Sequence, residues 1–479
     1  MSQNMNGRPG EQPSRKAILL LAGLCALGGG LLLGGFSGRV TANQTQLLKT
    51  TGVPRLVSVQ PLPEMESGEM CQFEPASAQT RLVAGLQQER AAARSALADE
   101  PSSGTLDRAP LRVIHDPYAT LSAVAVDSQR NEIVIQDENL YKILVYDRST
   151  NTPPSATMSE PKRMIGGPLT KIEFNCGLYI DPKNGDIYSI ANDTIDTMVV
   201  FSRNARGNVK PDRELHTPHR TFGIAVNEEA QELFLTIQDP AAVVVYPKLA
   251  KADDAPVRVI EGDHTQLADP HGISLDIKRK LVYVSNHGSV ASSKDGKNFT
   301  RQPISDGKWQ VPNEGVRRRN MKPGSGRFEA PSITVYALDA KGDAAPVRKI
   351  EGPKTQLNWP AQIYLDEEHD ELFVANDVGD SVLVFRASDN GDAAPVRVIK
   401  GPKTWVKNPT GIFVDTKNQE LVVANMGSHA TTVFPRTANG DVAPVRLIRA
   451  APQGTPALMI GNPGAVAYDT KRDQILVPN

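Results

Sequence analysis

Several features that identify a function directly are scarce or missing in this chain of 479 residues. It has three cysteines, Cys25, Cys71 and Cys176, and none forms a CxxC spacing, so no zinc or haem attachment motif is present. Aromatic residues make up only 5% of the chain, and the formal net charge of −1 gives no indication of nucleic acid as a partner. No nucleotide-binding glycine loop and no Ser-His-Asp arrangement stands out. These motifs therefore predict no catalytic residue and no resident cofactor.

Glycine and proline are abundant instead, with 38 and 36 residues, and the chain contains a repeat. The stretch GDAAPVRKIEG at Gly342–Gly352 returns 49 residues later as GDAAPVRVIKG and again as GDVAPVRLIRA. APVR-like elements occur seven times, at intervals of 51, 50, 45, 90, 49 and 49 residues. They begin at Ala109, Glu160, Lys210, Ala255, Ala345, Ala394 and Ala443. A period near fifty residues is typical of a propeller or an array.

Each interval contains the same order of short apolar runs. One run ends in Asp, as in GIFVD at Gly411–Asp415, and a second ends in Asn, as in ELFVAN at Glu371–Asn376. A third run such as SVLVF at Ser381–Phe385 precedes the next APVR element. The runs are rich in Val, Ile, Phe and Tyr and are bounded by turn residues, which predicts strands. Four strands in each period correspond to one propeller blade.

This alternation of GIFVD-like, LYVAN-like and ITVY-like runs resembles the NHL- and YVTN-type β-propeller repeats of bacterial cell-envelope proteins. The resemblance covers residues 109–479 and implies an all-β propeller fold. It does not select an activity, because propellers carry many unrelated functions.

Counting the strands predicts a ring of seven four-stranded blades. Six complete blades run from Ser122 to Ala450, and the runs at Gly464–Asp469 and Gln474–Asn479 would supply the inner two strands of a seventh. The first APVR element, Ala109–Ile114, would be its outer strand, so N- and C-terminal segments would share that blade. Its third strand is expected from Arg55–Val59 or from a partner chain, because an open edge invites pairing.

The first 108 residues are predicted to lie outside the propeller. Residues 1–16 form a short basic cytoplasmic segment, and residues 17–36 carry no charge and are long enough to cross a membrane as a helix. This transmembrane signal-anchor would place the propeller on the periplasmic side of a bacterial inner membrane. A cleaved signal peptide ending near Ala42 is the alternative. Residues 37–108 are interpreted as a linker or stalk with a helix near 76–99.

The doubled interval comes from an insertion at 288–331 in the fourth blade. It contains nine Lys or Arg against four acidic residues, and a long loop of this kind is usually functional or disordered. Aromatic residues together with Arg are typical of interfaces. We predict that the insertion binds an acidic protein surface, and a tolerated, solvated loop is the alternative. The candidate contact residues are Arg317, Arg318, Arg319, Trp309 and Phe299, with Phe328 as a further aromatic.

The loops that enter each inner strand, and those between the second and third strands, should share one face, called here the mouth face. Departures from the repeat on this face point to His271, His287, Asp193 and Asp377. A ring of Asn and Asp at the second-strand ends could hold a divalent cation, but capping of turns is the simpler interpretation. For the two histidines, a shared metal or a proton transfer is the alternative to two hydrogen-bonded loop side chains.

Two repeated residue types are interpreted as structural. The Asp that ends each inner run, such as Asp415, is expected to cap the turn that follows. The Arg of each APVR element is expected to protect an exposed outer edge, and a basic ring for a partner is the alternative. Cys71 and Cys176 could pair in an oxidising compartment.

These observations favour an exported, membrane-anchored propeller that acts as a protein-binding scaffold or accessory subunit of an envelope complex, without enzymatic activity. The alternative is a metal-dependent lactonase-like hydrolase that uses the mouth face. It is implied by the resemblance of gluconolactonase-like propellers to this fold. The ligands to test in that case are Asp137, Asp193, Asp239 and Asp377.

Overall fold

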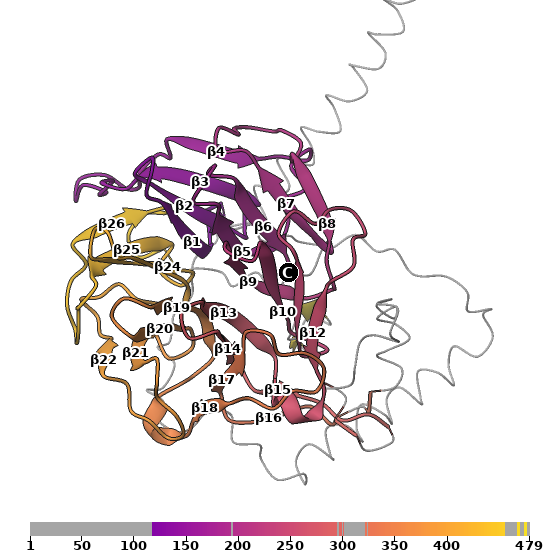
Figure 1. Ribbon diagram of the computed structural model, residues 1–479. Coiled ribbons are helices and arrows are strands. Elements are labelled where there is room, and N and C mark those ends of the chain that lie inside the picture. Colours follow the sequence, from indigo (N-terminus) through magenta and orange to yellow (C-terminus); the bar gives the residue numbers. More distant parts are fainter. Residues whose placement is uncertain are drawn as a thin grey trace, which may run out of the picture. The chain divides into compact units, whose positions relative to one another are not determined.

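The computed structural model describes residues 117–479, apart from 193–194, 295–296, 299, 301–320, 323, 456–466, 470–473 and 477–479. Within these residues the chain forms six four-stranded antiparallel sheets, which are the blades of a propeller (Figure 1). The strands of each blade follow one another in chain order. The first strand is innermost, because it packs against the first strands of both neighbouring blades.

Blades 1 to 3 consist of β1 (Leu121–Asp127), β2 (Glu132–Asp137), β3 (Lys142–Asp147), β4 (Arg163–Gly166), β5 (Asn175–Ile180), β6 (Ile187–Ala191), β7 (Thr197–Phe201), β8 (Arg213–His216), β9 (Thr221–Asn227), β10 (Glu232–Ile237), β11 (Ala242–Pro247) and β12 (Arg258–Glu261). Blades 4 to 6 consist of β13 (Pro270–Asp276), β14 (Leu281–Asn286), β17 (Ser332–Ala337), β18 (Arg348–Glu351), β19 (Pro360–Asp366), β20 (Glu371–Asn376), β21 (Ser381–Arg386), β22 (Arg397–Ile399), β23 (Pro409–Asp415), β24 (Glu420–Asn425), β25 (Ala430–Pro435) and β26 (Arg446–Arg449).

The remaining elements are short. The base of the insertion forms a hairpin of β15 (Ser289–Val290) and β16 (Arg327–Phe328). Two 3-10 turns, η1 (Asp263–Thr265) and η2 (Pro353–Thr355), follow the outer strands of blades 3 and 4. Near the C-terminus, β27 (Ala467–Asp469) pairs only with β28 (Gln474–Leu476), in a sheet of their own. Within the described residues no helix is long and apolar enough to cross a membrane, and residues 17–36 lie outside them.

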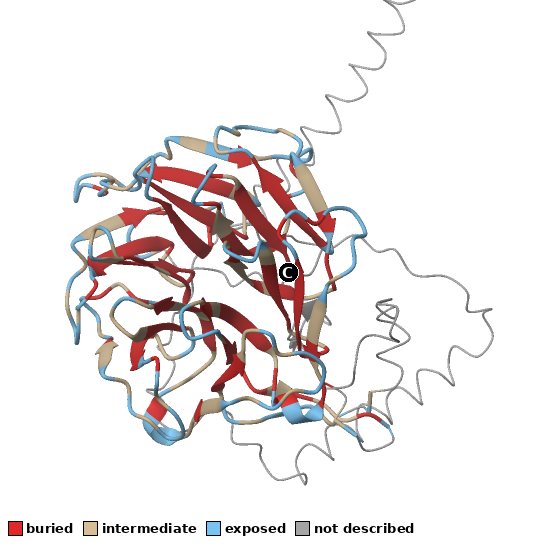
Figure 2. Ribbon diagram, viewed as in Figure 1, coloured by how far each residue is buried: buried red, intermediate tan, exposed pale blue. Residues whose placement is uncertain are grey.

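The hydrophobic core lies between blades. The inner three strands are buried on both faces, whereas the fourth strands and the loops carry the exposed residues (Figure 2). This explains why the strands are near-continuous Val, Ile, Leu and Phe runs, because both faces of each sheet are covered. The buried apolar residues form six clusters, and each cluster joins two neighbouring blades. No blade could bury these faces alone.

The repeated Arg of the outer strand binds the next blade. In all six blades its side chain donates a hydrogen bond to the carbonyl oxygen just after the third strand of the following blade. The six pairs are Arg163 to Arg203, Arg213 to Lys248, Arg258 to Leu338, Arg348 to Ala387, Arg397 to Arg436 and Arg446 to Arg148, at 2.8–3.5 Å. The interpretation of these arginines as edge protection is therefore wrong, since their side chains are partly buried between blades.

The same arginines are also held within their own blades. In four blades the partner is the Glu at the start of the second strand, and in blades 2 and 4 it is a tyrosine hydroxyl. These pairs are Arg163–Glu132, Arg258–Glu232, Arg397–Glu371, Arg446–Glu420, Arg213–Tyr188 and Arg348–Tyr283. Charged hydrogen bonds of this kind are stronger than neutral ones.

The Gly-Asp that precedes three of the APVR elements is a second contact between blades. Gly342 pairs with the outer strand of blade 3, and its peptide N–H donates to the carbonyl of Val259 at 2.6 Å. The carboxylate of Asp343 then accepts the backbone N–H of His264 at 2.6 Å. Asp392 and Asp441 accept equivalent bonds from Lys354 and Lys403 at the next two boundaries. The eleven repeated residues thus join consecutive blades.

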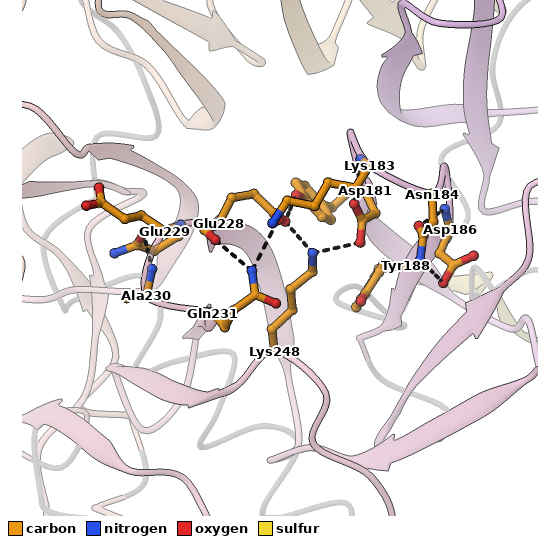
Figure 3. A network of polar contacts seen from close by, with 12 residues as sticks. Asp181, Lys183, Asn184, Asp186, Tyr188, Glu228, Glu229, Ala230, Gln231 and Lys248 are labelled. Atoms are coloured by element: carbon orange, nitrogen blue, oxygen red, sulfur yellow. Dashed lines mark hydrogen bonds and ion pairs between the residues drawn. The ribbon is translucent and has the colours of Figure 1, made fainter.

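At the boundary of blades 2 and 3 a buried lysine reinforces the contact (Figure 3). Lys248, whose side chain is 3% exposed, bridges Asp181 at 2.7 Å and Glu228 at 2.5 Å. Burial by itself raises the pKa of both carboxyls, but the hydrogen bonds from Lys248 outweigh it and hold the pKa of each below its usual range. Arg203 and Arg436 occupy the equivalent place at the boundaries of blades 1 and 2 and of blades 5 and 6, where they pair with Asp127 and Asp366 of the preceding blades.

The prediction of seven blades is wrong, because blade 6 contacts blade 1 directly (Figure 1). Arg446 donates to the carbonyl of Arg148, the guanidinium of Arg148 pairs with Glu420 at 2.7 Å, and one of the six apolar clusters spans both blades. These are the contacts that join the other blades, so no gap is left for another sheet. The strands predicted for the seventh blade, β27 and β28, form their separate pair, and residues 55–59 and 109–114 lie outside the described residues.

A double-mutant cycle tests this closure. We expect Arg148→Met and Glu420→Gln to show a coupling of about 0.5–3 kcal/mol in urea unfolding, because the two side chains share one partly buried ion pair. Glu371 holds the same repeat position in blade 5, so the control cycle of Arg148→Met with Glu371→Gln should be additive within about 0.5 kcal/mol. Additivity of both cycles would mean that blades 1 and 6 do not meet in solution.

A second prediction concerns acid stability. Burial raises the pKa of Glu132, Glu371 and Glu420, but hydrogen bonds and charges from their Lys and Arg partners outweigh it and lower each pKa below its usual value. The unfolded chain then binds protons more tightly than the folded one, so stability falls as the pH drops below about 5. Thermal unfolding followed by circular dichroism should give a Tm that declines between about pH 5 and pH 3. A Glu420→Gln variant should start lower at pH 7 and decline less, and a wild-type Tm unchanged down to pH 3 would contradict the assignment.

Candidate functional site

A row of five neighbouring rings crosses the mouth face from blade 3 to blade 5. The ring centroids of neighbours lie 4.2, 3.3, 4.9 and 6.2 Å apart, and the second and third pairs are stacked, with interplanar angles of 19° and 27°. In order, the rings belong to Phe222, His271, His287, Trp359 and Phe328. The first four come from loops or strand ends of the blades, and Phe328 comes from the base of the insertion. The row therefore joins the insertion to the centre of the propeller.

The repeat explains how the row is built. Asp269 and Trp359 stand immediately before the Pro that begins the inner strands of blades 4 and 5, where blade 6 has Asn408. All three adopt positive φ, at 57°, 52° and 42°. Asn takes this left-handed conformation readily, whereas a bulky residue rarely does. His287 follows the second strand of blade 4, where blade 5 has Asp377.

His271 is held by hydrogen bonds on both ring nitrogens. Its Nδ1 lies 3.0 Å from the carbonyl oxygen of Asp269, and its Nε2 lies 2.6 Å from the amide nitrogen of Gln238. A carbonyl oxygen can only accept, so Nδ1 carries the hydrogen and Nε2 accepts from Gln238. Burial lowers the pKa of His271 to about 3, so the ring is neutral at physiological pH.

His287 is buried without such support. Its side chain is 5% exposed, and within the described residues Nε2 has no hydrogen-bond partner. Burial, with a further contribution from His271, lowers its pKa well below the usual value. Its imidazole is stacked 3.3 Å from that of His271, closer than the 4.5–7 Å at which aromatic rings ordinarily pair.

Asp269 completes a compact group with the two histidines. One possible ligand atom from each of the three side chains lies within 4.8 Å of the others, and this is the one such group within the described residues. Burial, together with the nearby Asp239, raises the pKa of Asp269 to about 7, with Arg220 acting in the opposite direction. The group thus combines two neutral imidazoles with a carboxyl that is costly to ionise.

One side chain crosses the ring just below the mouth face. Gln362 of β19 reaches the opposite side of the ring, where its amide donates to the carbonyl of Cys176 in β5 at 2.8 Å. The equivalent position in most other blades is glycine, and at Gly272 an added Cβ would lie 2.4 Å from the carbonyl oxygen of Ala361 in the next blade. The inner strands of neighbouring blades are therefore too close for a side chain between them at this level, and Gln362 instead spans the ring.

The base of the insertion lies over the same blades. The backbone N–H of Ala241, between β10 and β11, donates to the carbonyl of Thr300 at 2.7 Å, and Glu329 donates to Gly288 at 2.7 Å. Phe328 is 65% exposed beside Trp359. The exposed Phe328 thus extends the row of rings with an apolar side chain that is open to solvent.

The predicted mouth residues have different outcomes. His271 and His287 are brought together, as expected for two residues on the same face of one blade. Asp377 is not part of their group and accepts a hydrogen bond from Asn408 at 3.2 Å. Asp193 lies outside the described residues, as do Phe299, Trp309, Arg317, Arg318, Arg319 and Cys71.

The interpretation of the repeated Asn and Asp as turn caps is confirmed. Asn286, Asn376 and Asn425 accept backbone N–H groups of the incoming loops at 2.6–3.3 Å. The Asp at the end of the inner strand accepts a backbone N–H from the turn that follows in blades 1, 2, 4, 5 and 6. Asp137 likewise accepts the N–H groups of Thr120, Asn139 and Leu140.

Sequence reasoning missed Asp269, Trp359 and Gln362 as residues of this face. Each occupies a defined repeat position where it differs from its counterparts, so an alignment of the residues just before and after the inner-strand Pro would have found them. The APVR element and the apolar runs, on which the repeats were aligned, do not include these positions.

No family model and no curated protein matches the chain. Among solved structures, Kuenenia stuttgartiensis hydrazine synthase is 11% identical with a TM-score of 0.43, covering 78% of this chain and 98% of that one. A functionally unknown protein from Desulfotomaculum acetoxidans is 12% identical with a TM-score of 0.41, covering 72% and 88%. These values carry no conclusion about function. The NHL- and YVTN-type resemblance is confirmed only as far as the β-propeller fold.

The buried position of Asp377 predicts in which direction the stability of the protein changes with pH. Burial raises its pKa to about 6, with Asn408 acting in the opposite direction. The folded protein therefore binds this proton more tightly than the unfolded chain, and the site loses stability as the pH rises from about 4 through 6. Asp377→Asn should stabilise the protein by about 1–2 kcal/mol at pH 8 and by less at pH 4.5, measured by urea unfolding. The exposed Asp263→Asn variant serves as a control, and an equal effect of Asp377→Asn at both pH values would contradict the prediction.

Proposed function

We propose that this protein is a binding scaffold that holds a protein partner on the mouth face of blades 3 to 5. The observation that carries the proposal is the row of five rings, which ends in the exposed Phe328 at the base of the insertion. Clustered aromatic side chains are the usual anchors of protein interfaces. The propeller fold is compatible with this role, since it presents loops from several blades on one rigid face.

The distribution of charge also supports the proposal of a protein-binding scaffold. The arginines repeated in every described blade are bound to carboxylates, hydroxyls and carbonyls, so they are not available as a basic ring for a partner. The insertion, in contrast, has nine basic and four acidic residues. We infer that Arg317, Arg318 and Arg319 contact an acidic partner surface and that Trp309 and Phe299 also take part in the contact.

Export and membrane anchoring form part of the proposal. Residues 17–36 would hold the protein in a bacterial inner membrane with the propeller on the periplasmic side, where it would act as an accessory subunit of an envelope complex. The uncharged twenty-residue stretch behind a basic segment supports this.

A metal-dependent lactonase-like hydrolase is less well supported. Its ligands would converge at the mouth from several blades, but Asp137 caps its own turn and Asp377 binds Asn408. Within the described residues neither belongs to a group that could hold an ion.

Purification of the tagged full-length protein in mild detergent, with mass spectrometry of what is retained, tests the scaffold. Deleting only residues 301–320 preserves the base of the insertion, so the fold should survive. We expect a stoichiometric partner that is lost on this deletion and on charge reversal at Arg317, Arg318 and Arg319.

Point variants locate the interface. Phe328→Ser should weaken partner binding by about tenfold or more, since it removes an aromatic anchor. Val347→Ser is the matched control, because Val347 is similarly exposed, at 57% against 65%, but lies beside the outer strand. A partner retained equally by all variants, or no partner at all, would refute the proposal.

A further inference from the structure

We propose that Asp269, His271 and His287 form a binding site for one divalent transition-metal ion on the mouth face of blade 4. This inference goes beyond the scaffold role and does not depend on it. Asp269 and His271 lie at the start of β13 and His287 directly follows β14, and their possible ligand atoms lie within 4.8 Å of one another.

The strongest observation is the unpartnered nitrogen of His287. A buried polar atom without a hydrogen bond costs free energy, and native structures contain few of them. Nε2 of His287 is such an atom, on a side chain that is 5% exposed and packed between His271 and Trp359. A metal ion would give this lone pair a partner.

The distances suit coordination after small side-chain rotations. Metal–ligand bonds to His and Asp are about 2.0–2.2 Å, so two ligand atoms on a tetrahedral ion lie about 3.4 Å apart. Nδ1 of His271 and Oδ1 of Asp269 are already separated by 3.6 Å. The parallel imidazoles must turn so that their lone pairs converge, which would also relieve their close stacking.

Gln238 can support His271 when its Nδ1 binds an ion. An ion at Nδ1 displaces the hydrogen that now points to the carbonyl of Asp269, and the ring then carries its hydrogen on Nε2. Gln238 lies 2.6 Å from Nε2 and can accept that hydrogen by turning its amide oxygen toward it. Metal-bound histidines are ordinarily oriented by such a bond on the other nitrogen.

The donor set selects the kind of ion. Imidazole suits Zn²⁺, Co²⁺, Ni²⁺ and Cu²⁺, whereas Ca²⁺ and Mg²⁺ prefer sites made of oxygen. Two imidazoles and one carboxylate therefore favour a transition-metal ion at this group over Ca²⁺ or Mg²⁺.

The test is a titration of the chelator-treated full-length protein in detergent with Zn²⁺ and with Co²⁺, using calorimetry and the visible absorption of bound Co²⁺. We expect one ion per chain and no comparable response to Ca²⁺ or Mg²⁺. His271→Ala and His287→Ala should each weaken binding by more than about 100-fold, since even outer partners of metal sites contribute about 10–100-fold.

Two further variants separate coordination from folding. Asp269→Asn keeps a residue that tolerates the positive φ and should weaken binding while leaving the Tm of the metal-free protein within a few degrees of wild type. His216→Ala removes a histidine that is 57% exposed and paired with Asp253, and it should bind metal like wild type. Absence of Zn²⁺ and Co²⁺ binding, or binding that survives all three site variants, would overturn the proposal. This experiment measures metal binding by the purified protein. Its result is therefore independent of whether a protein partner is found.

Discussion

The bond on which this structure depends is the one from the outer-strand arginine to a carbonyl one or two residues beyond the third strand of the next blade. It occurs at all six boundaries, including the one between Arg446 and Arg148 that closes the ring. Each arginine is positioned by a Glu or Tyr of its own blade, so the contact links the outer strand of one sheet to the end of the third strand of the next. A single blade has two apolar faces and cannot be stable alone. The repeated arginines therefore determine how the faces of neighbouring blades align, while the apolar clusters between blades supply most of the stabilisation.

This division of roles explains where function can be sought. The repeated Asp, Asn and Arg side chains are occupied by turns and by neighbouring blades, so their periodicity reflects architecture. The residues left over are those that break the period: His287 where blade 5 has Asp377, Trp359 where blade 6 has Asn408, and Gln362 where most blades have Gly. His287 and Trp359 lie in the row of rings, and Gln362 donates a hydrogen bond across the ring to Cys176.

The sequence predicts the individual blades well and their closure poorly, for physical reasons. Strand periodicity and turn residues are local, so the six blades from Ser122 to Ala450 could be counted from the pattern. Which blade meets which at the ends is decided by non-local contacts such as Arg148–Glu420, 272 residues apart, and no repeat pattern shows them. The apolar runs of β27 and β28 match an inner pair of strands, yet they pair only with each other. The two histidines could be placed on one face, but Asp269 beside them could not, because its position lies outside the aligned elements.

One side chain that crosses the ring bears on what the mouth face can do. Gln362 donates a hydrogen bond to the carbonyl of Cys176 in the opposite blade, and the inner-strand glycines let neighbouring blades pack closely at that level. A ligand that entered the ring there would have to displace this bond. The row from Phe222 to Phe328 is the surface there that combines apolar area with buried nitrogen and oxygen donors. A partner held by this row would contact three consecutive blades, whose relative positions are fixed by the arginine bonds, so the surface is rigid before anything binds.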